Sequence, residues 1–428
     1  MRFADAVAEL GRRQPEHMPK PDLDRMRALA TLLADPQLTY PTIHVTGTNG
    51  KTTTARLAAA IACAHGLTTG LFTSPHLASV TERFEICGDP MAEEAFGEEF
   101  EHLLAYLRTV DDRVGRVTYF EALTALAYLS FADAPVALGV FEVGMGGTWD
   151  ATNLVSGDVA VICPIGLDHP QLGSTIAQVT GEKAGIIKQG KVAVVREQDD
   201  EALEVIQQRC EKQIATLLLE GRDWELADLT PAVGGQAIAI RGLHATYDDI
   251  LLPIYGEHAA HSAAAAVVAV EALLERPLDR DAVRLALGAA TSPGRLEVAA
   301  RRPLVILDGA HNPAAARALA EALPDTFTWD RLHLVMGVFA DKDLDGIVGP
   351  LAPLADAGYA AAVDSVRARP QHEVAAEMIA HDIPTETFTT VRDALDAAAS
   401  AASDGDLILV TGSLYTVADA RRALLEDP

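Results

Sequence analysis

Short apolar runs alternate along this chain with longer segments of helical spacing, and this alternation restricts the possible folds more than any other feature. The pattern is typical of parallel α/β sheets, because each strand needs a helical crossover before the next can run in the same direction. The predicted strands are Thr42–Val45, Val136–Val143, Val159–Ile165, Val192–Val195, Leu304–Leu307, Leu332–Met336 and Leu407–Val410. The predicted helices are Thr53–His65, Glu93–Thr109, Glu121–Phe131, Pro313–Leu323 and Val417–Leu425.

The alternation is interrupted at Thr291–Arg295, where a Pro-Gly pair ends a helical segment. A chain of 428 residues is long enough for two or three domains. We therefore predict a larger N-terminal domain over residues 1–292 and a smaller C-terminal α/β domain over residues 293–428. A cleft between two such domains is a common place for a ligand.

Composition excludes several classes of protein and partner. Hydrophobic residues make up 49% of the chain and charged residues 22%, which supports a large core and excludes a disordered or fibrous protein. The 34 Lys and Arg residues against 61 Asp and Glu residues give a formal net charge of -27. Nucleic acid and anionic membranes are therefore poor partners, because both are polyanions. An anionic substrate must be held by local cations, helix N-termini or a metal ion.

The cysteines predict a protein without disulfides. They lie far apart, without a CxxC pair or a histidine at metal-site spacing, at Cys63, Cys87, Cys163 and Cys210. Apolar surroundings at two of them indicate free, buried thiols. The chain does not begin like a signal peptide, and its longest nearly apolar stretch, residues 263–274, is too short to cross a membrane. We expect a soluble protein of a reducing compartment, the cytoplasm.

The strongest functional motif is a glycine-containing loop between a predicted strand and a predicted helix. It consists of Gly47, Thr48, Asn49, Gly50, Lys51, Thr52 and Thr53. Glycines let backbone N–H groups close around phosphate oxygens, and the helix N-terminus adds its dipole. In that arrangement Lys51 would neutralise the β- and γ-phosphates of ATP, and Thr52 could reach Mg²⁺. The general Walker pattern expects glycine where Val45 stands, and a tight turn without a ligand is the alternative interpretation.

Polar side chains end two other predicted strands. Glu142 follows an apolar run, where a carboxylate is costly unless it is paired or binds a metal. Ligands gather at the carboxyl ends of strands in α/β sheets, so we predict that Glu142 binds Mg²⁺, with a purely structural acid as the alternative. Asp168 and His169 follow another apolar strand in the same manner.

Two further positions carry chemistry. Lys183 lies among small and apolar residues and either pairs with Glu182 or Glu142 or reacts as an uncharged amine with CO₂. In the C-terminal part, Asp308 ends a predicted strand and suits a ribose hydroxyl or a hydrogen bond within the loop. Asn312 is the predicted N-cap of the helix that follows.

Together these stretches resemble the Mur ligase superfamily, and within it the dihydrofolate synthase/folylpolyglutamate synthase branch. The shortened phosphate loop of the superfamily, Gly-Thr-x-Gly-Lys-Thr/Ser, matches Gly47–Thr52 and accounts for Val45. The resemblance covers residues 37–418. The branch is indicated by Thr73–Leu77, Glu82-Arg83, Glu142–Asn153, Asp168-His169, Glu182–Gly185, Ser292–Glu297, Asp308–Pro313 and Gly412–Tyr415.

The resemblance implies an ATP-dependent ligase. The γ-phosphoryl group of ATP would pass to a carboxylate of dihydropteroate or a reduced folate, and the amine of L-glutamate would attack the acyl phosphate. It also implies a P-loop-containing N-terminal domain of the Mur ligase type and a smaller Rossmann-like C-terminal glutamate-ligase domain that closes over the nucleotide. A monomer that binds small molecules, without nucleic acid or membrane, is expected.

Individual roles follow from the same resemblance. The implied catalytic residues are Lys51, Lys183, Arg295 and His311, with Lys183 carbamylated. The implied ATP-binding residues are Gly47 to Thr53, Ser262, Arg295 and Asp308. Two Mg²⁺ ions are expected, with ligands from Thr52, Ser74, Glu142 and His169.

The chain departs from the family pattern at several positions. Thr148 stands where the family has an arginine, the Asp-His loop is one residue shorter, and Ala259 and Ser262 replace two amides expected near the adenine. Two other functions therefore remain open. One is an amide ligase that acts on a different carboxylic acid, and the other is a nucleotide-binding protein without ligase activity.

Overall fold

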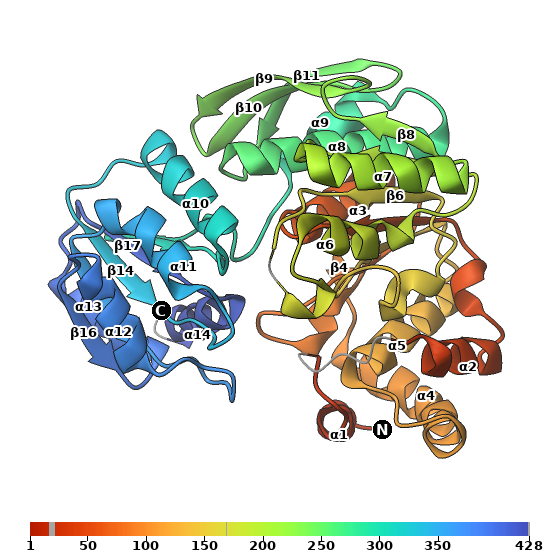
Figure 1. Ribbon diagram of the computed structural model, residues 1–428, viewed down its shortest axis with the longest axis horizontal. Helices are drawn as coiled ribbons and strands as arrows, with labels where there is room; N and C mark the ends of the chain where they lie inside the picture. The colour runs from red at the N-terminus through yellow and green to blue at the C-terminus, as the bar shows by residue number, and fades with distance from the viewer. Residues whose placement is uncertain (17–21, 168, 427–428) are drawn as a thin grey trace. The chain divides into compact units, whose positions relative to one another are not determined.

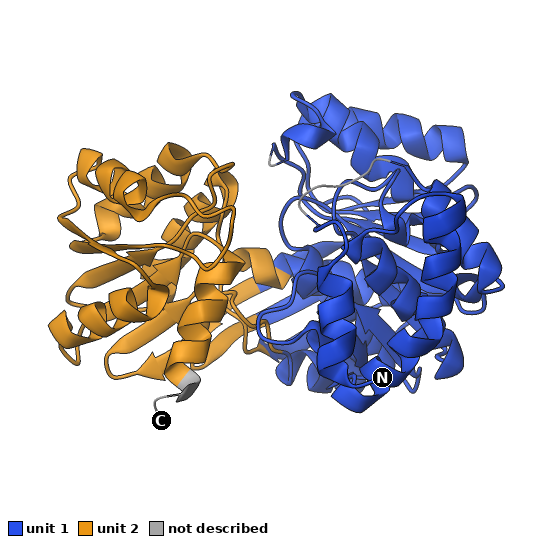
Figure 2. Cartoon of the chain, turned by 90° about the horizontal axis from the view of Figure 1, so that it is seen from below, with its two compact units in different colours: residues 1–228, 238–251, 261–290 blue, residues 229–237, 252–260, 291–428 orange. Residues whose placement is uncertain are grey.

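The computed structural model describes residues 1–16, 22–167 and 169–426, so Asp168 of the predicted Asp-His pair lies outside the described residues. The chain divides into two compact units (Figure 2). The first contains residues 1–228, 238–251 and 261–290, and the second contains residues 229–237, 252–260 and 291–428. Each unit has its own mostly parallel sheet, which confirms the predicted α/β class (Figure 1).

The sheet of the first unit has eight strands in the order β4-β3-β2-β5-β1-β6-β7-β8, with β3 and β4 antiparallel to their neighbours. Its central strands are buried along their whole length, as expected where helices cover both faces of a parallel sheet. The predicted strands at 136–143 and 159–165 are shorter in the structure, because their ends continue into loops. The strands are β1(Thr42–Thr46), β2(Thr69–Phe72), β3(Phe84–Ile86), β4(Asp89–Pro90), β5(Leu138–Glu142), β6(Val159–Ile162), β7(Val192–Val195) and β8(Thr216–Leu219).

Local sequence signals mark the start of two helices in this part of the chain. Gly50, with φ of +84°, is the N-cap of α3, so this helix starts at Lys51 rather than at Thr53. A capping box of Thr118 and Glu121 starts α5. No described helix is long and apolar enough to cross a membrane. The helices are α1(Phe3–Gly11), α2(Asp24–Leu32), α3(Lys51–Ala64), α4(Glu93–Arg113), α5(Tyr119–Asp133), α6(Ile176–Lys183), α7(Asp200–Gln213), α8(Glu257–Leu274) and α9(Arg280–Gly288).

An aromatic cluster holds the end of β5 in place. The ring of Phe141, directly before Glu142, packs against Tyr128, Phe131 and Phe72 with ring centroids 5.5, 5.6 and 6.1 Å away. All four rings are buried. Because each aromatic contact adds to the apolar area removed from water, this packing fixes the backbone that presents Glu142.

A three-stranded sheet, in the order β11-β10-β9, follows β8 and was not predicted. Its first strand is mostly half-buried or exposed and includes Pro231, so it lacks the continuous apolar run that marks the buried strands. The strands are β9(Glu225–Ala232), β10(Gly235–Arg241) and β11(Thr246–Leu252).

The second unit contains a six-stranded sheet in the order β12-β13-β17-β14-β15-β16, parallel except for β12. The predicted strands at 304–307 and 332–336 are confirmed with the same bounds. The strands are β12(Glu297–Arg301), β13(Leu304–Leu307), β14(Leu332–Met336), β15(Ala357–Ala361), β16(Thr385–Phe388) and β17(Leu407–Thr411). The helices are α10(Pro313–Thr326), α11(Leu344–Leu351), α12(Gln371–Ala380), α13(Val391–Ala401) and α14(Leu414–Glu426).

The prediction that all four cysteines are free is wrong. Cys63, near the end of α3, forms a disulfide with Cys87, in the turn between β3 and β4. Their Cα atoms are 5.6 Å apart, within the usual range for a disulfide. Cys163 and Cys210 are free and buried, as predicted. The apolar residues around Cys63 in the sequence gave no sign of this partner, because only the packing of α3 beside the sheet brings Cys87 close.

We expect Cys87→Ser to lower the free energy of unfolding of the first unit by about 3 kcal/mol, because the 24-residue separation gives the unfolded chain a long loop to close. Urea denaturation followed by circular dichroism measures this loss. The double variant with Ser at positions 63 and 87 should be insensitive to reductant, whereas the wild type should lose stability in it. Titration of four thiols in unfolded, unreduced protein would contradict the disulfide.

Candidate active site

Two glycines determine the shape of the loop between β1 and α3. Gly47 has a φ of +148°, and a Cβ there would lie 2.5 Å from the Cβ of Cys163. Gly50 has a φ of +84°, a conformation that side chains other than glycine rarely adopt. The loop therefore approaches the segment after β6 closely and turns directly into α3. Its backbone amides and the N-terminus of α3 form the kind of arrangement that binds phosphate.

Hydrogen bonds hold the loop in this form. Thr48 Oγ1 donates to the carbonyl oxygen of Gly166 at 2.9 Å. The Lys51 ammonium folds back across the loop and donates to the carbonyl oxygens of Gly47 and Thr48, both at 3.1 Å. Lys51 is half-buried, as is Asn49, while Thr53 is buried in the first turn of α3. A cation thus lies over the part of the loop where phosphate oxygens would bind.

Glu142, the last residue of β5, connects the start of α3 with the segment after β2 at the carboxyl end of the sheet. Its side chain is buried, with 1% of the residue exposed. Oε1 accepts a hydrogen bond from Thr52 Oγ1 at 2.7 Å, and Oε2 accepts one from the backbone N–H of Ser74 at 3.1 Å. The structure therefore brings together three of the four predicted metal ligands, Thr52, Ser74 and Glu142. The hydroxyl of Thr52 and the carboxylate of Glu142 offer the oxygen ligands that Mg²⁺ prefers.

His169, the fourth predicted ligand, lies in the loop after β6. It is half-buried and precedes the turn Pro170–Leu172, whose last N–H donates to its carbonyl oxygen at 3.0 Å. The assignment of His169 to a metal remains a prediction.

Lys183, the last residue of α6, reaches the same loop from another direction. It is 3% exposed, and its Nζ donates to the carbonyl oxygen of Gly47 at 2.7 Å. Lys51 donates to that same oxygen. The two lysine side chains therefore approach the phosphate loop at the same backbone oxygen.

An arginine beside the loop was missed by the sequence analysis. Arg196 follows β7 and is buried, and its Nη1 donates to Ser262 Oγ at 3.3 Å. A Cβ on Gly50 would lie 3.3 Å from Ser262 Oγ and 3.4 Å from Arg196 Nη1, so both groups border the start of α3. The signal that could have found Arg196 is its position directly after the buried run Val192–Val195, at the same sheet edge as Glu142.

A carboxylate holds this arginine. Glu220 forms an ion pair with Arg196 at 3.8 Å and accepts hydrogen bonds from His261 Nδ1 at 2.5 Å and from the N–H of Glu197 at 2.8 Å. Burial raises the pKa of Glu220, but these hydrogen bonds and the charge of Arg196 outweigh it and leave the pKa below its ordinary value. Ser262 is thus part of a charged network behind the phosphate loop, and its predicted contact with adenine remains a prediction.

The second unit gathers the other predicted residues on two adjacent loops. Asp308 accepts hydrogen bonds from the N–H groups of Leu296 and Ala310, both at 2.8 Å, so the loop hydrogen bond suggested by the sequence is present. A Cβ on Gly309 would lie 2.6 Å from Nη1 of Arg295, which places that guanidinium against the loop. His311 Nδ1 lies 2.8 Å from the carbonyl oxygen of Gly309.

The predicted helix cap is confirmed in the same loop. The Asn312 side chain accepts a hydrogen bond from the N–H of Ala315 at 2.9 Å, and Pro313 occupies the first turn of α10. Arg295, Asp308 and His311 are therefore held together at the carboxyl end of β13, while the phosphate loop and its partners form a separate group in the first unit.

Comparisons with known proteins agree with this arrangement of motifs. Residues 45–270 match the Mur ligase middle domain, and residues 294–414 match the glutamate ligase domain of Mur ligases. The dihydrofolate synthase/folylpolyglutamate synthase of Mycobacterium tuberculosis is 40% identical over 98% of this chain and 93% of its own length. The protein of the same name from Escherichia coli is 34% identical over 89% of this chain and 87% of its own length.

Solved structures of folylpolyglutamate synthases are similar to this chain over its whole length. The M. tuberculosis folylpolyglutamate synthase complexed with ADP superposes with a TM-score of 0.95 at 38% identity, covering 100% of this chain and 99% of that one. E. coli FolC in complex with DHPP and ADP superposes with a TM-score of 0.89 at 29% identity, covering 100% and 98%. The chain belongs to the Mur ligase family and, within it, to the dihydrofolate synthase/folylpolyglutamate synthases.

Proposed function

We propose that this protein joins L-glutamate to the carboxylate of dihydropteroate or a reduced folate in an ATP-dependent reaction. The observation that carries the proposal is the buried Glu142, a carboxylate beside the phosphate loop where a metal ion for phosphoryl transfer would bind. The relatives named above are synthases of this kind, and one was solved with DHPP and ADP. We also propose that the protein acts as a cytoplasmic monomer, with a domain boundary between residues 292 and 293.

The proposed reaction has two steps. A carboxylate oxygen of the pterin substrate attacks the γ-phosphorus of ATP, which forms the acyl phosphate and releases ADP. The amine of L-glutamate then attacks the acyl carbon, which forms the amide and releases phosphate and a proton. The loop amides and Lys51 would bind the phosphate oxygens and stabilise the negative charge that accumulates on them during transfer. Arg295 and His311 would contact the phosphates, and Asp308 the ribose.

The oxygen donors around Glu142 fit magnesium. Thr52 Oγ1 would hold one ion, and Ser74, Glu142 and His169 would hold a second. Bound Mg²⁺ would neutralise charge on the phosphate and acyl oxygens. Glu142 is buried and already fixed by two hydrogen bonds, so its carboxylate would not need to reorganise when the ion binds.

The substrate is tested by ATP-dependent phosphate release with L-glutamate and a panel of acids. We expect release with dihydropteroate or tetrahydrofolate and none with unrelated aromatic acids. If only a different acid stimulates phosphate release, the protein is an amide ligase with another substrate. If the protein binds ADP but no acid stimulates phosphate release, it is a nucleotide-binding protein without ligase activity.

We expect Lys51→Ala and Glu142→Ala each to lower kcat several hundredfold, or by about 3–4 kcal/mol. The first removes a cation placed for the transferring phosphoryl group, and the second removes a proposed metal ligand. Steady-state phosphate release measures the effect. Lys212→Ala and Glu211→Ala, which alter exposed residues of α7, are the matched controls and should behave as wild type. Turnover near the wild-type value in either test variant would remove that residue from the mechanism.

We expect Lys183 to be carbamylated in the active enzyme. Its neutral amine would attack CO₂, forming a C–N bond and releasing one proton, and the carbamate N–H can still donate to Gly47. The anionic group could then hold a metal-bound water, where a protonated lysine would be repelled. Isotopically labelled bicarbonate should give a carbamate signal by NMR that Lys183→Ala lacks. Full activity in protein without that signal would contradict the modification.

A further inference from the structure

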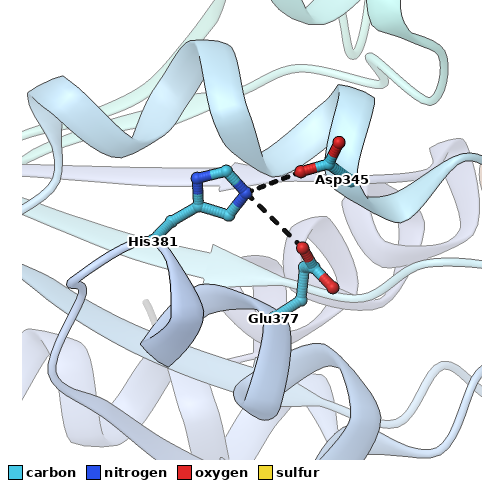
Figure 3. Close-up of side chains that lie close together, drawn as sticks. All are labelled: Asp345, Glu377 and His381. Atoms are coloured by element: carbon cyan, nitrogen blue, oxygen red, sulfur yellow. Dashed lines mark hydrogen bonds and ion pairs between the residues drawn. The ribbon is translucent and has the colours of Figure 1, made fainter.

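A histidine and two carboxylates converge on the second unit, on helices that carry none of the residues assigned above. Asp345 lies in the first turn of α11, Glu377 lies on α12, and His381 directly follows the last residue of α12. The imidazole points between the two carboxylates, which come from different helices (Figure 3). One ligand-type atom from each side chain lies within 4.8 Å of the other two.

The spacing of these atoms suits a metal ion. His381 Nε2 lies 2.8 Å from Oδ1 of Asp345 and 3.4 Å from Oε1 of Glu377 (Figure 3). Two ligands of a tetrahedral Zn²⁺ ion, each at about 2.0–2.1 Å from the metal, are roughly 3.3 Å apart. The Glu377–His381 pair already has this separation. Asp345 would have to withdraw by roughly half an ångström, and its side chain is 76% exposed, which leaves room for the change.

The backbone presents the three groups without rearrangement. Glu377 and His381 are four residues apart, so their side chains lie on the same face of α12 and its C-terminal turn. The imidazole lies across α11, because a Cβ on Gly349 would be 3.5 Å from His381 Cε1. Gly349 is one helical turn after Asp345, so the ring is held against the helix that supplies the third ligand.

The donor set selects a transition metal rather than magnesium. One imidazole nitrogen with two carboxylate oxygens suits Zn²⁺, and three protein ligands leave a position for water. A metal ion would bind Nε2 of the neutral imidazole with the single ring proton on Nδ1, and it would take the place of the hydrogen bond between Nε2 and Asp345.

We propose that Asp345, Glu377 and His381 form a Zn²⁺ site that clamps α11 to α12. The site joins two helices of one unit through side chains alone, and it does not depend on the proposed ligase reaction. Its effect would be on the stability of the second unit.

The test uses the full chain after removal of metal, with saturating Mg²⁺ to occupy sites that prefer it. Zn²⁺ is titrated in competition with a chromophoric chelator, and Co²⁺ replaces it for visible absorption. We expect His381→Gln and Glu377→Gln each to weaken Zn²⁺ binding by about tenfold or more. Zn²⁺ should also raise the unfolding temperature of the wild type but not of these variants.

His372→Gln is the matched control, because His372 is an exposed histidine on the same helix. It should bind Zn²⁺ as the wild type does. If all three variants bind Zn²⁺ with the affinity of the wild type, or if the wild type does not bind Zn²⁺ at micromolar concentration, the cluster is a set of ordinary ion pairs. If His381→Gln does not fold, Glu377→Gln decides the question. It replaces a carboxylate by an amide of the same size, at the acidic residue that lies farther from His381 Nε2.

Discussion

One buried carboxylate connects the parts of the first unit on which the proposed chemistry depends. Burying an ionised side chain is costly unless hydrogen bonds or charges satisfy it, and Glu142 is 1% exposed. Thr52 and the backbone of Ser74 supply those bonds, so the phosphate loop and the segment after β2 are both positioned by the end of β5. Phe141, packed among aromatic rings directly before it, keeps that strand end in place.

Basic side chains gather at the phosphate loop although the molecule as a whole is acidic. The chain carries a formal net charge of -27, yet Lys51 and Lys183 both donate to the carbonyl oxygen of Gly47, and Arg196 borders the start of α3. The side chains of Lys51 and Arg196 provide cations that a polyanionic nucleotide needs. The acidic remainder of the surface therefore does not argue against ATP binding, because the field at the loop is set by the nearest groups.

The second unit repeats the same design with different side chains. Asp308 ends β13 much as Glu142 ends β5, and it uses both oxygens to hold the backbone of the two loops that carry Arg295 and His311. In both units an acid at a strand end holds a loop next to basic side chains. The shared principle is that carboxyl ends of parallel strands leave backbone groups for side chains and ligands to satisfy.

The amino-acid sequence by itself determined the α/β class, most of the buried strands, the phosphate loop, and the acidic residues at strand ends. These features depend on local patterns: apolar runs, glycine positions, and a charged residue directly after a strand. Tertiary structure alone decided the Cys63–Cys87 disulfide, the three-stranded sheet, the position of Arg196 beside the loop, and the meeting of Asp345 with His381. The three-stranded sheet consists of consecutive strands, but its first strand has no buried apolar run to mark it. The other features join residues distant in the sequence, and no local pattern specifies which distant elements pack together.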